Sequence, residues 1–139
     1  LRYMIAALDG FDEAEALPVA EMPELELWVL HRLAELDGAV RKGYQAYDYP
    51  GVWQALFTFA TSDLSAFWFD IRKDALYCDA PSSVRRRACR TVMNEVFLRL
   101  TAWLAPILVF TTEEVWLERT FKPVSACCPA CRVLSPNSI

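Results

Sequence analysis

Glycine and histidine are scarce in this sequence of 139 residues, which contains 4 glycines and 1 histidine. Sheets joined by tight turns need more glycine than this, so the composition favours an all-helical fold. Since His31 is the single histidine, a Ser-His-Asp or Cys-His catalytic site would have no other imidazole to serve as its base. A glycine-rich phosphate loop is missing too. We therefore expect a chain without catalytic residues of its own.

Long apolar runs are also missing. The longest, "AWLAPILVF", is too short to cross a bilayer and contains Pro106. The N-terminal residues do not have the pattern of a signal peptide. We therefore expect a cytoplasmic protein that does not contact a membrane. The chain begins with an apolar stretch at Leu1 instead of a methionine, and we interpret it as part of a longer protein.

The five cysteines are unevenly spaced, and their odd number argues against the disulfide framework of a secreted domain. Three of them, Cys127, Cys128 and Cys131, lie in "ACCPACR". One Cys-x-x-Cys pair is half of a structural zinc site, and no second pair follows, so we predict no metal site. The segment 122–139 contains three prolines and no hydrophobic period, and we predict an irregular or disordered tail.

Apolar residues are abundant, at 55% of the chain, and 13% of the residues are aromatic, which is enough for a sizeable core. Their spacing is helical almost throughout. The first stripe predicts a helix over residues 23–47, with Pro23 at its start and Glu24 and Glu26 at the positive end of its dipole. Its apolar face contains Leu25, Val29, Leu33, Leu36, Val40, Tyr44 and Tyr47.

Three further helices are expected. One apolar stripe consists of Trp53, Leu56, Phe57, Ala60, Leu64, Phe67, Trp68 and Ile71. The period is lost from Arg72 to Pro81, where we predict a loop, and it returns over residues 84–104 before Pro106 ends that helix. The motif "TTEE" predicts a short fourth helix with Thr111 as its N-cap. The pattern as a whole predicts an all-α antiparallel helical bundle.

Positive charge is concentrated in one stretch of an acidic chain. The net charge is −4 and the pI about 5.0, yet residues 70–90 contain 6 of the 14 basic side chains. Residues 1–50 carry a net charge of −6, residues 51–100 of +2 and residues 101–139 of zero. Such a chain is not a free-standing non-specific nucleic-acid binder, which would use a broad basic field. A narrow basic strip that touches a few phosphates remains compatible with it.

Helical phasing places Arg86, Arg87 and Arg90 together on a flank of the third predicted helix that faces away from the apolar stripe. Arg85 points towards the core, but it lies in the first turn, where a long side chain can reach water. The three arginines are candidate phosphate contacts. Their spacing agrees equally with a solvated face that is paired with acidic neighbours.

The predicted loop contributes Arg72, Lys73 and Tyr77 at the same end of an antiparallel bundle. Arginine and lysine bind phosphates, and tyrosine can stack on a base or a sugar. The alternative is an ordinary connecting loop whose charges are solvated. Composition and spacing leave both interpretations open.

Two stretches taken together, "MPELELWVLHRLAELDGAV" and "LFTFATSDLSAFWFDIRKDALYCDAPSSVRRRACRTVMNEVFLRLTAWLAPILVFTTEEVW", closely resemble the anticodon-binding domain of bacterial-type isoleucyl-tRNA synthetases of class Ia. The resemblance runs from Leu1 to about Arg119. Valyl and leucyl enzymes share parts of the pattern, whereas "YCDAP" and the arginine run favour isoleucine. Two departures are Val109, in place of a second proline, and the tail after Arg119.

The resemblance implies a helical domain over residues 1–121, with 1–22 as the linker from a catalytic core and 122–139 as the tail. Such a domain contacts the anticodon stem and loop of tRNA, and the implied tRNA-binding residues are Arg72, Lys73, Tyr77, Arg86, Arg87 and Arg90. The full-length enzyme would be a monomer that attaches isoleucine to tRNA using ATP and Mg²⁺. This chain has neither of the core's ATP-binding signatures, so its expected partners are tRNA and the catalytic and editing domains. The alternatives are the valyl or leucyl equivalent and a structural protein-interaction bundle.

Overall fold

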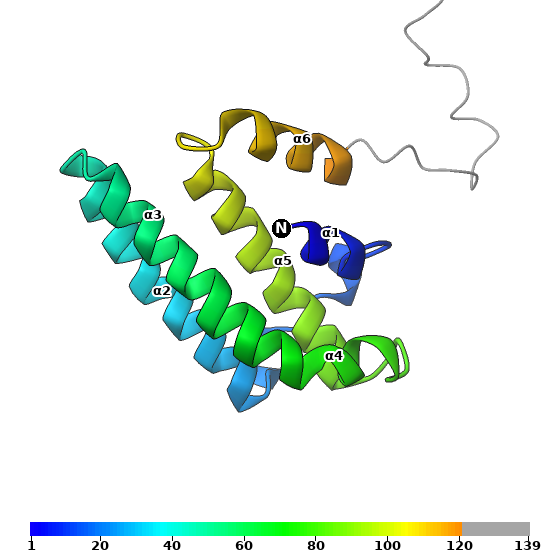
Figure 1. The fold of residues 1–139 in the computed structure, drawn as a ribbon. Coiled ribbons are helices and arrows are strands. Elements are labelled where there is room, and N and C mark those ends of the chain that lie inside the picture. Colours follow the sequence, from blue (N-terminus) through cyan, green and yellow to red (C-terminus); the bar gives the residue numbers. More distant parts are fainter. Residues whose placement is uncertain (121–139) are drawn as a thin grey trace, which may run out of the picture.

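A computed structural model describes residues 1–120 of the chain (Figure 1). Its helices are α1 (Arg2–Ala7), α2 (Glu24–Gln45), α3 (Tyr49–Thr58), α4 (Asp70–Tyr77), α5 (Val84–Leu104) and α6 (Val109–Thr120), with the 3-10 turns η1 (Glu13–Glu15) and η2 (Val19–Glu21) and the π-helix η3 (Phe59–Phe69). These residues form no strand, and the all-α prediction is confirmed. The predicted tail with Cys127, Cys128 and Cys131 lies outside the described residues.

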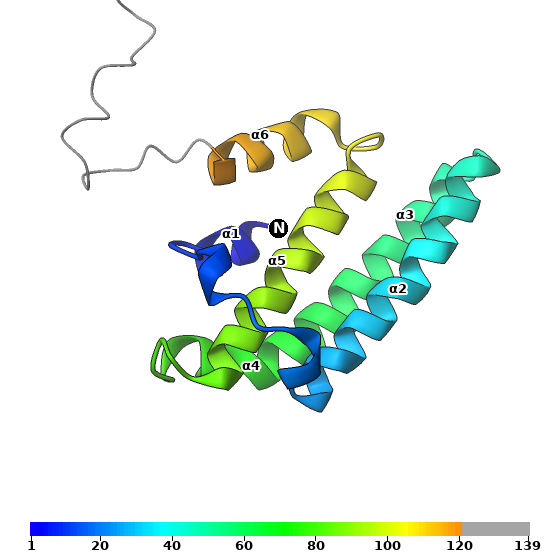
Figure 2. The same cartoon turned by 180° about the vertical axis from the view of Figure 1, so that it is seen from behind.

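The longest feature is a helical hairpin. Helix α2 begins at Glu24, one residue later than predicted, because Pro23 is its N-cap and not its first helical residue. The helix ends at Gln45, so Tyr47 lies beyond it. The elements α3, η3 and α4 then follow without a break as one rod from Tyr49 to Tyr77, which runs back along α2 (Figures 1 and 2). The prediction of Tyr47 on the buried helix face is wrong, because the helix ends before this residue and its side chain is exposed.

The rod differs from the predicted second helix in its length and in the face that it buries. Its core face is lined by Val52, Leu56, Phe59, Leu64, Trp68 and Leu76, whereas the predicted core residues Trp53, Phe57, Phe67 and Ile71 are exposed. A π-helix takes more residues per turn than an α-helix, so the buried positions step by five from Phe59 to Leu64. The predicted loop after Arg72 is also wrong, because α4 remains helical to Tyr77.

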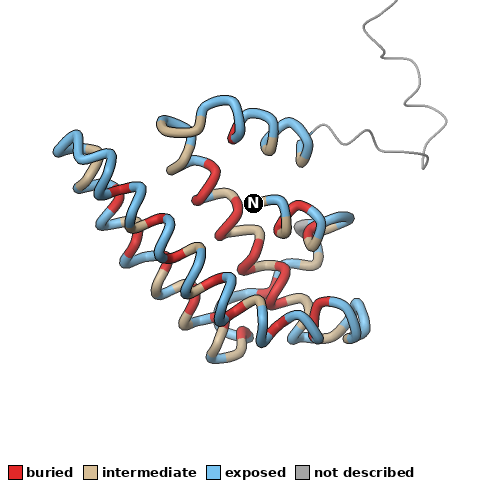
Figure 3. The backbone as a smooth tube through the Cα atoms, in the orientation of Figure 1, coloured by how far each residue is buried: buried red, intermediate tan, exposed pale blue. Residues whose placement is uncertain are grey.

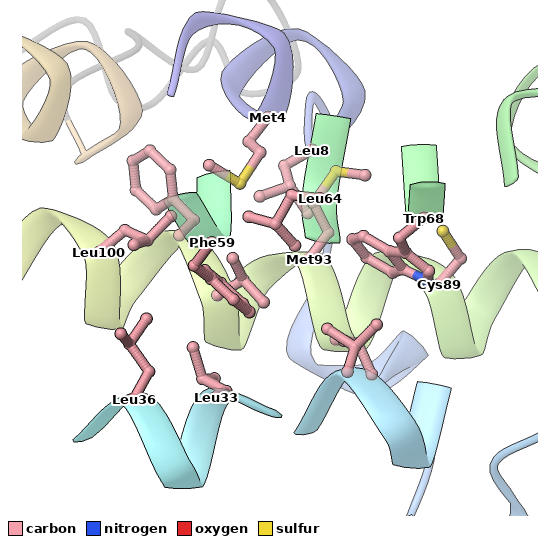
Figure 4. Packing of buried hydrophobic residues seen from close by; sticks show 14 of the residues in the cluster. Met4, Leu8, Leu33, Leu36, Phe59, Leu64, Trp68, Cys89, Met93 and Leu100 are labelled. Carbon is pink, nitrogen blue, oxygen red and sulfur yellow. The ribbon is translucent and has the colours of Figure 1, made fainter. Parts of the chain in front are cut away.

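Helix α5 is the centre of the fold. It packs against α2 and α4 on one side and against α1 and α6 on the other, and buried residues recur along it from Ala88 to Thr101 (Figure 3). Figure 4 shows side chains of α1, α2, η3 and α5 that meet around it, among them Met4, Leu33, Leu64 and Met93. Segment 1–22 therefore contributes to the core itself, through Met4, Ile5, Leu8, Leu17 and Met22. Its role as a linker stays a prediction.

Helix α6 begins at Val109, three residues before the start that an N-cap at Thr111 would give, so the assignment of Thr111 as its N-cap is wrong. The reason is that the backbone of Leu108 already accepts from the amide of Thr112, at 3.0 Å. The buried hydroxyl of Thr112 also donates to the Leu108 carbonyl, at 2.8 Å. Within residues 1–120, no helix is both long and apolar enough to span a membrane.

Candidate nucleic-acid interface

The six predicted tRNA-binding residues come from two elements that meet at one end of the bundle, α4 and the first turns of α5 (Figure 1). A short turn joins these helices, in which the hydroxyl of Ser83 donates to the carboxylate of Asp79, at 3.1 Å. The two helices hold the six residues near one another, but they give them very different surroundings.

Arg72 is buried and bound to another helix. Its Nε and Nη2 atoms donate to the two carboxylate oxygens of Glu26 on α2, at 2.6 and 2.8 Å, and Glu26 is fully buried. Such a bidentate pair fixes the two planar groups relative to each other. Arg72 therefore joins the rod to α2 from inside the bundle, and it does not lie in a loop at its surface.

Arg90 is buried as well, with 7% of its surface exposed, so its prediction on an exposed flank is wrong. Its Nη1 donates to the Glu15 carboxylate at 2.9 Å, its Nη2 donates to the Asp9 carbonyl at 2.8 Å, and its guanidinium lies over the ring of Phe11. All three partners belong to the N-terminal segment 1–22. This segment folds back over the flank of α5 that helical phasing predicted to be exposed to solvent.

Arg86 and Arg87 are half-buried. The Nη1 of Arg86 donates to the carbonyl of Asp79 at 2.8 Å, and the Nε of Arg87 donates to the carbonyl of Glu15 at 3.0 Å. A guanidinium has five N–H donors. Each side chain is therefore anchored by one hydrogen bond to the backbone and has further donors, of which the Nε of Arg86 is buried.

Lys73, Tyr77 and Arg85 are exposed. The ammonium of Lys73 lies 2.9 Å from an oxygen of Asp70, and this hydrogen bond raises the pKa of Lys73, so the lysine stays charged at neutral pH. Tyr77 is 66% exposed. Its hydroxyl neighbours Tyr3, whose pKa is raised to about 12, mainly by burial.

Helical phasing predicts that Arg85 points towards the core, and Arg85 is therefore not among the six predicted tRNA-binding residues. It is exposed because it precedes the first buried position of α5, Ala88. Its place in the first turn is the signal that identifies it. We call Lys73, Tyr77, Arg85, Arg86 and Arg87 the basic end, since they are the exposed and half-exposed members of this cluster.

The basic end consists of four cationic side chains and one phenol. No three His, Cys, Asp or Glu side chains gather into a possible metal site within residues 1–120. Cys89 of α5 is fully buried, and burial raises the pKa of its thiol to about 12, so it is not a nucleophile at neutral pH. Cationic side chains at one end of a net-negative chain suit contact with a few phosphates.

Comparison with known proteins identifies the family. A family model described as the anticodon-binding domain of tRNA ligase matches residues 26–130. Curated isoleucine–tRNA ligases match at 62% identity over 120 residues in Ruegeria pomeroyi, at 54% over 125 in Brucella abortus and at 53% over 119 in Gluconobacter oxydans.

These matches cover 86%, 90% and 86% of this chain but only 12%, 13% and 12% of the respective relatives. The chain thus spans about an eighth of the length of the curated relatives it matches. The family model alone covers well over half of the chain, including all of α3 to α6 and nearly all of α2. The chain belongs to the family of anticodon-binding domains of tRNA ligases.

Proposed function

We propose that this chain is the tRNA-contacting domain of an isoleucine–tRNA ligase and that its basic end binds tRNA phosphates. The observation that carries this proposal is the gathering of exposed and half-exposed cations at the α4–α5 end of a chain whose net charge is −4. The family match supports tRNA as the partner, and the names of the relatives support isoleucine over valine or leucine.

The contribution of this domain to aminoacylation is the placement of tRNA. Phosphate contacts fix the register and orientation of a nucleic acid without reading its sequence. A tRNA held by its anticodon arm would present its acceptor end to a catalytic core elsewhere in the protein, and correct placement lowers the barrier of the reaction. The partners in this proposal are tRNA and the catalytic and editing domains, within a monomeric cytoplasmic enzyme.

ATP and Mg²⁺ belong to the catalytic core in this proposal. The residues of this chain do not fit them, because it has neither a glycine-rich phosphate loop nor, within residues 1–120, a cluster of carboxylates that would hold a metal ion. We therefore assign no step of the reaction to this chain. Its residues bind and orient the nucleic acid.

The test is a titration of the 139-residue chain with tRNA, duplex DNA and heparin. We expect weak binding of tRNA, in the micromolar range, with a preference over the other two polyanions. Replacing Lys73 and Arg85 by alanine removes two exposed charges of the basic end, and replacing Arg2 and Arg99 removes two exposed charges elsewhere. If the first double variant binds tRNA as well as the second does, the assignment of the basic end is wrong. Binding of an acidic protein instead of tRNA would support the protein-interaction alternative.

A further inference from the structure

The segment between α1 and α2 passes along the flank of α5 (Figure 2). We call its residues 8–17 the strap. The backbone hydrogen bonds within the strap are short-range: the amide of Phe11 donates to the carbonyl of Leu8 at 3.0 Å, and the amide of Glu15 donates to the carbonyl of Asp12 at 2.9 Å. Such bonds shape the strap locally but do not attach it to the bundle. Its position therefore depends on the side chains of the helices beside it.

Polar side chains of α5 and α6 bond to the backbone of the strap at four positions. They are Arg119 to the Leu8 carbonyl at 3.4 Å, Arg90 to the Asp9 carbonyl at 2.8 Å, Arg87 to the Glu15 carbonyl at 3.0 Å and Thr91 to the Leu17 amide at 3.1 Å. Backbone groups of an irregular segment need such partners, because no helix or sheet satisfies them. We call the strap docked when these four bonds are formed.

Arg87 belongs both to this set and to the basic end. Its Nε–H is used in the bond to Glu15, and its two Nη groups carry four further N–H donors. Arg87 is half-exposed, and in contrast to the Nε of Arg86, none of its nitrogen atoms is buried without a partner. The strap and a phosphate can therefore bind different edges of the same guanidinium at the same time.

The sign of this coupling follows from order and charge. A free arginine side chain loses rotamer freedom when it binds an anion. The bond to the Glu15 carbonyl already restricts Arg87, so a phosphate that binds while the strap is docked loses less entropy. The carboxylate of Glu15 would repel a phosphate, but it is paired with the Nη1 of Arg90 at 2.9 Å. The two partners of Arg87 should therefore stabilise each other.

We propose that Arg87 links the docking of the strap to the binding of a tRNA phosphate at the basic end, so that each event strengthens the other. The proposal rests on the proposed function, which supplies tRNA as the phosphate ligand. Linkage of this kind is reciprocal: if the docked strap raises the affinity of Arg87 for phosphate, bound tRNA must make opening of the strap rarer by the same factor. Arg86 is outside this linkage, because it is anchored to the carbonyl of Asp79 between α4 and α5.

The test is amide hydrogen exchange of the 139-residue chain, with and without saturating tRNA. The reporter is the amide of Leu17, which bonds to the hydroxyl of Thr91 while the strap is docked. We expect tRNA to slow the exchange of this amide about fivefold or more. Unchanged exchange would overturn the proposal. Faster exchange would overturn it too, because it would show that tRNA and the strap compete for Arg87.

Arg87→Ala and its matched control Arg86→Ala separate this linkage from simple coverage of the strap by tRNA. Both remove a half-buried arginine with one hydrogen bond to the backbone, and both should weaken tRNA binding to a similar degree. At saturating tRNA, the slowing of Leu17 exchange should be lost in Arg87→Ala and kept in Arg86→Ala. Equal slowing in the two variants would contradict the proposal. Arg87→Lys keeps the charge without the fork that serves two partners, and it should behave as Arg87→Ala does if the alanine variant is not folded.

These outcomes are distinguishable from a failure of the proposed function. If Lys73→Ala/Arg85→Ala binds tRNA weakly while tRNA leaves Leu17 exchange in the parent chain unchanged, the linkage alone is wrong. If that double variant binds tRNA as well as Arg2→Ala/Arg99→Ala does, the basic end does not contact tRNA, and the linkage is wrong together with the proposed function.

Discussion

The two ends of the helical hairpin differ in how they use their polar side chains. At the α4–α5 end, Arg72 and Arg90 are buried and bound to Glu26 and Glu15, and the surface cations surround them. At the α2–α3 end, aromatic rings are exposed, and Arg41 is paired on the surface of its own helix. The arginines at the first end therefore divide into two groups: the internal ones join helices, and the surface ones are those for which we propose tRNA binding. Mutations should separate the two groups.

The largest effect is expected for Glu26→Ala, which leaves the buried guanidinium of Arg72 without its partner. Breaking a buried ion pair in this way costs about 3–5 kcal/mol, and we expect this loss in the free energy of unfolding measured with urea. Replacing both residues by apolar ones of similar size, as in Glu26→Leu/Arg72→Met, should cost much less. A loss below about 1 kcal/mol for Glu26→Ala would show that Arg72 is not held by this pair.

Arg90→Ala should be the next most harmful substitution. It removes hydrogen bonds to Glu15 and Asp9 and the contact with Phe11, so we expect a loss of about 2 kcal/mol in the free energy of unfolding. The matched control is Arg85→Ala on the same helix, for which we expect a change within about 0.5 kcal/mol. Equal losses in the two variants would contradict the distinction between internal and surface arginines.

Tyr47→Gly should have the smallest effect on stability, and in the opposite direction. Tyr47 follows the end of α2 with φ of 57°, and relief of this left-handed conformation is worth up to about 1 kcal/mol, so we expect the Tm to stay the same or to rise. Calorimetry of the parent and variant chains measures this difference. A clear fall in Tm would mean that the ring stabilises the turn.

Much of the fold follows from local patterns. The bounds of α2 and α5 agree with the predictions to within two residues, because both helices keep a 3.6-residue period and are delimited by Pro23 and Pro106. The buried face of the rod was predicted poorly. The π-helical winding of η3 shifts the phase of the stripe, and hydrophobicity does not encode that winding.

The candidate site was harder to predict because its members depend on partners far away in the sequence. Arg72 and Glu26 are 46 residues apart, and Arg90 and Glu15 are 75 apart. A helical wheel considers one helix at a time, so it can show neither pair. The sequence predicted correctly that the cluster lies at one end of the bundle, but not which of its arginines remain at the surface.

The most direct test of the central claim is the salt dependence of tRNA binding by Lys73→Ala/Arg85→Ala. Each phosphate contact contributes about 0.7–0.9 to the slope of log K against log salt concentration. We predict that this variant binds tRNA more weakly than Arg2→Ala/Arg99→Ala and that its slope is smaller by about 1–2. Equal affinities and equal slopes for the two variants would show that the basic end does not contact tRNA phosphates.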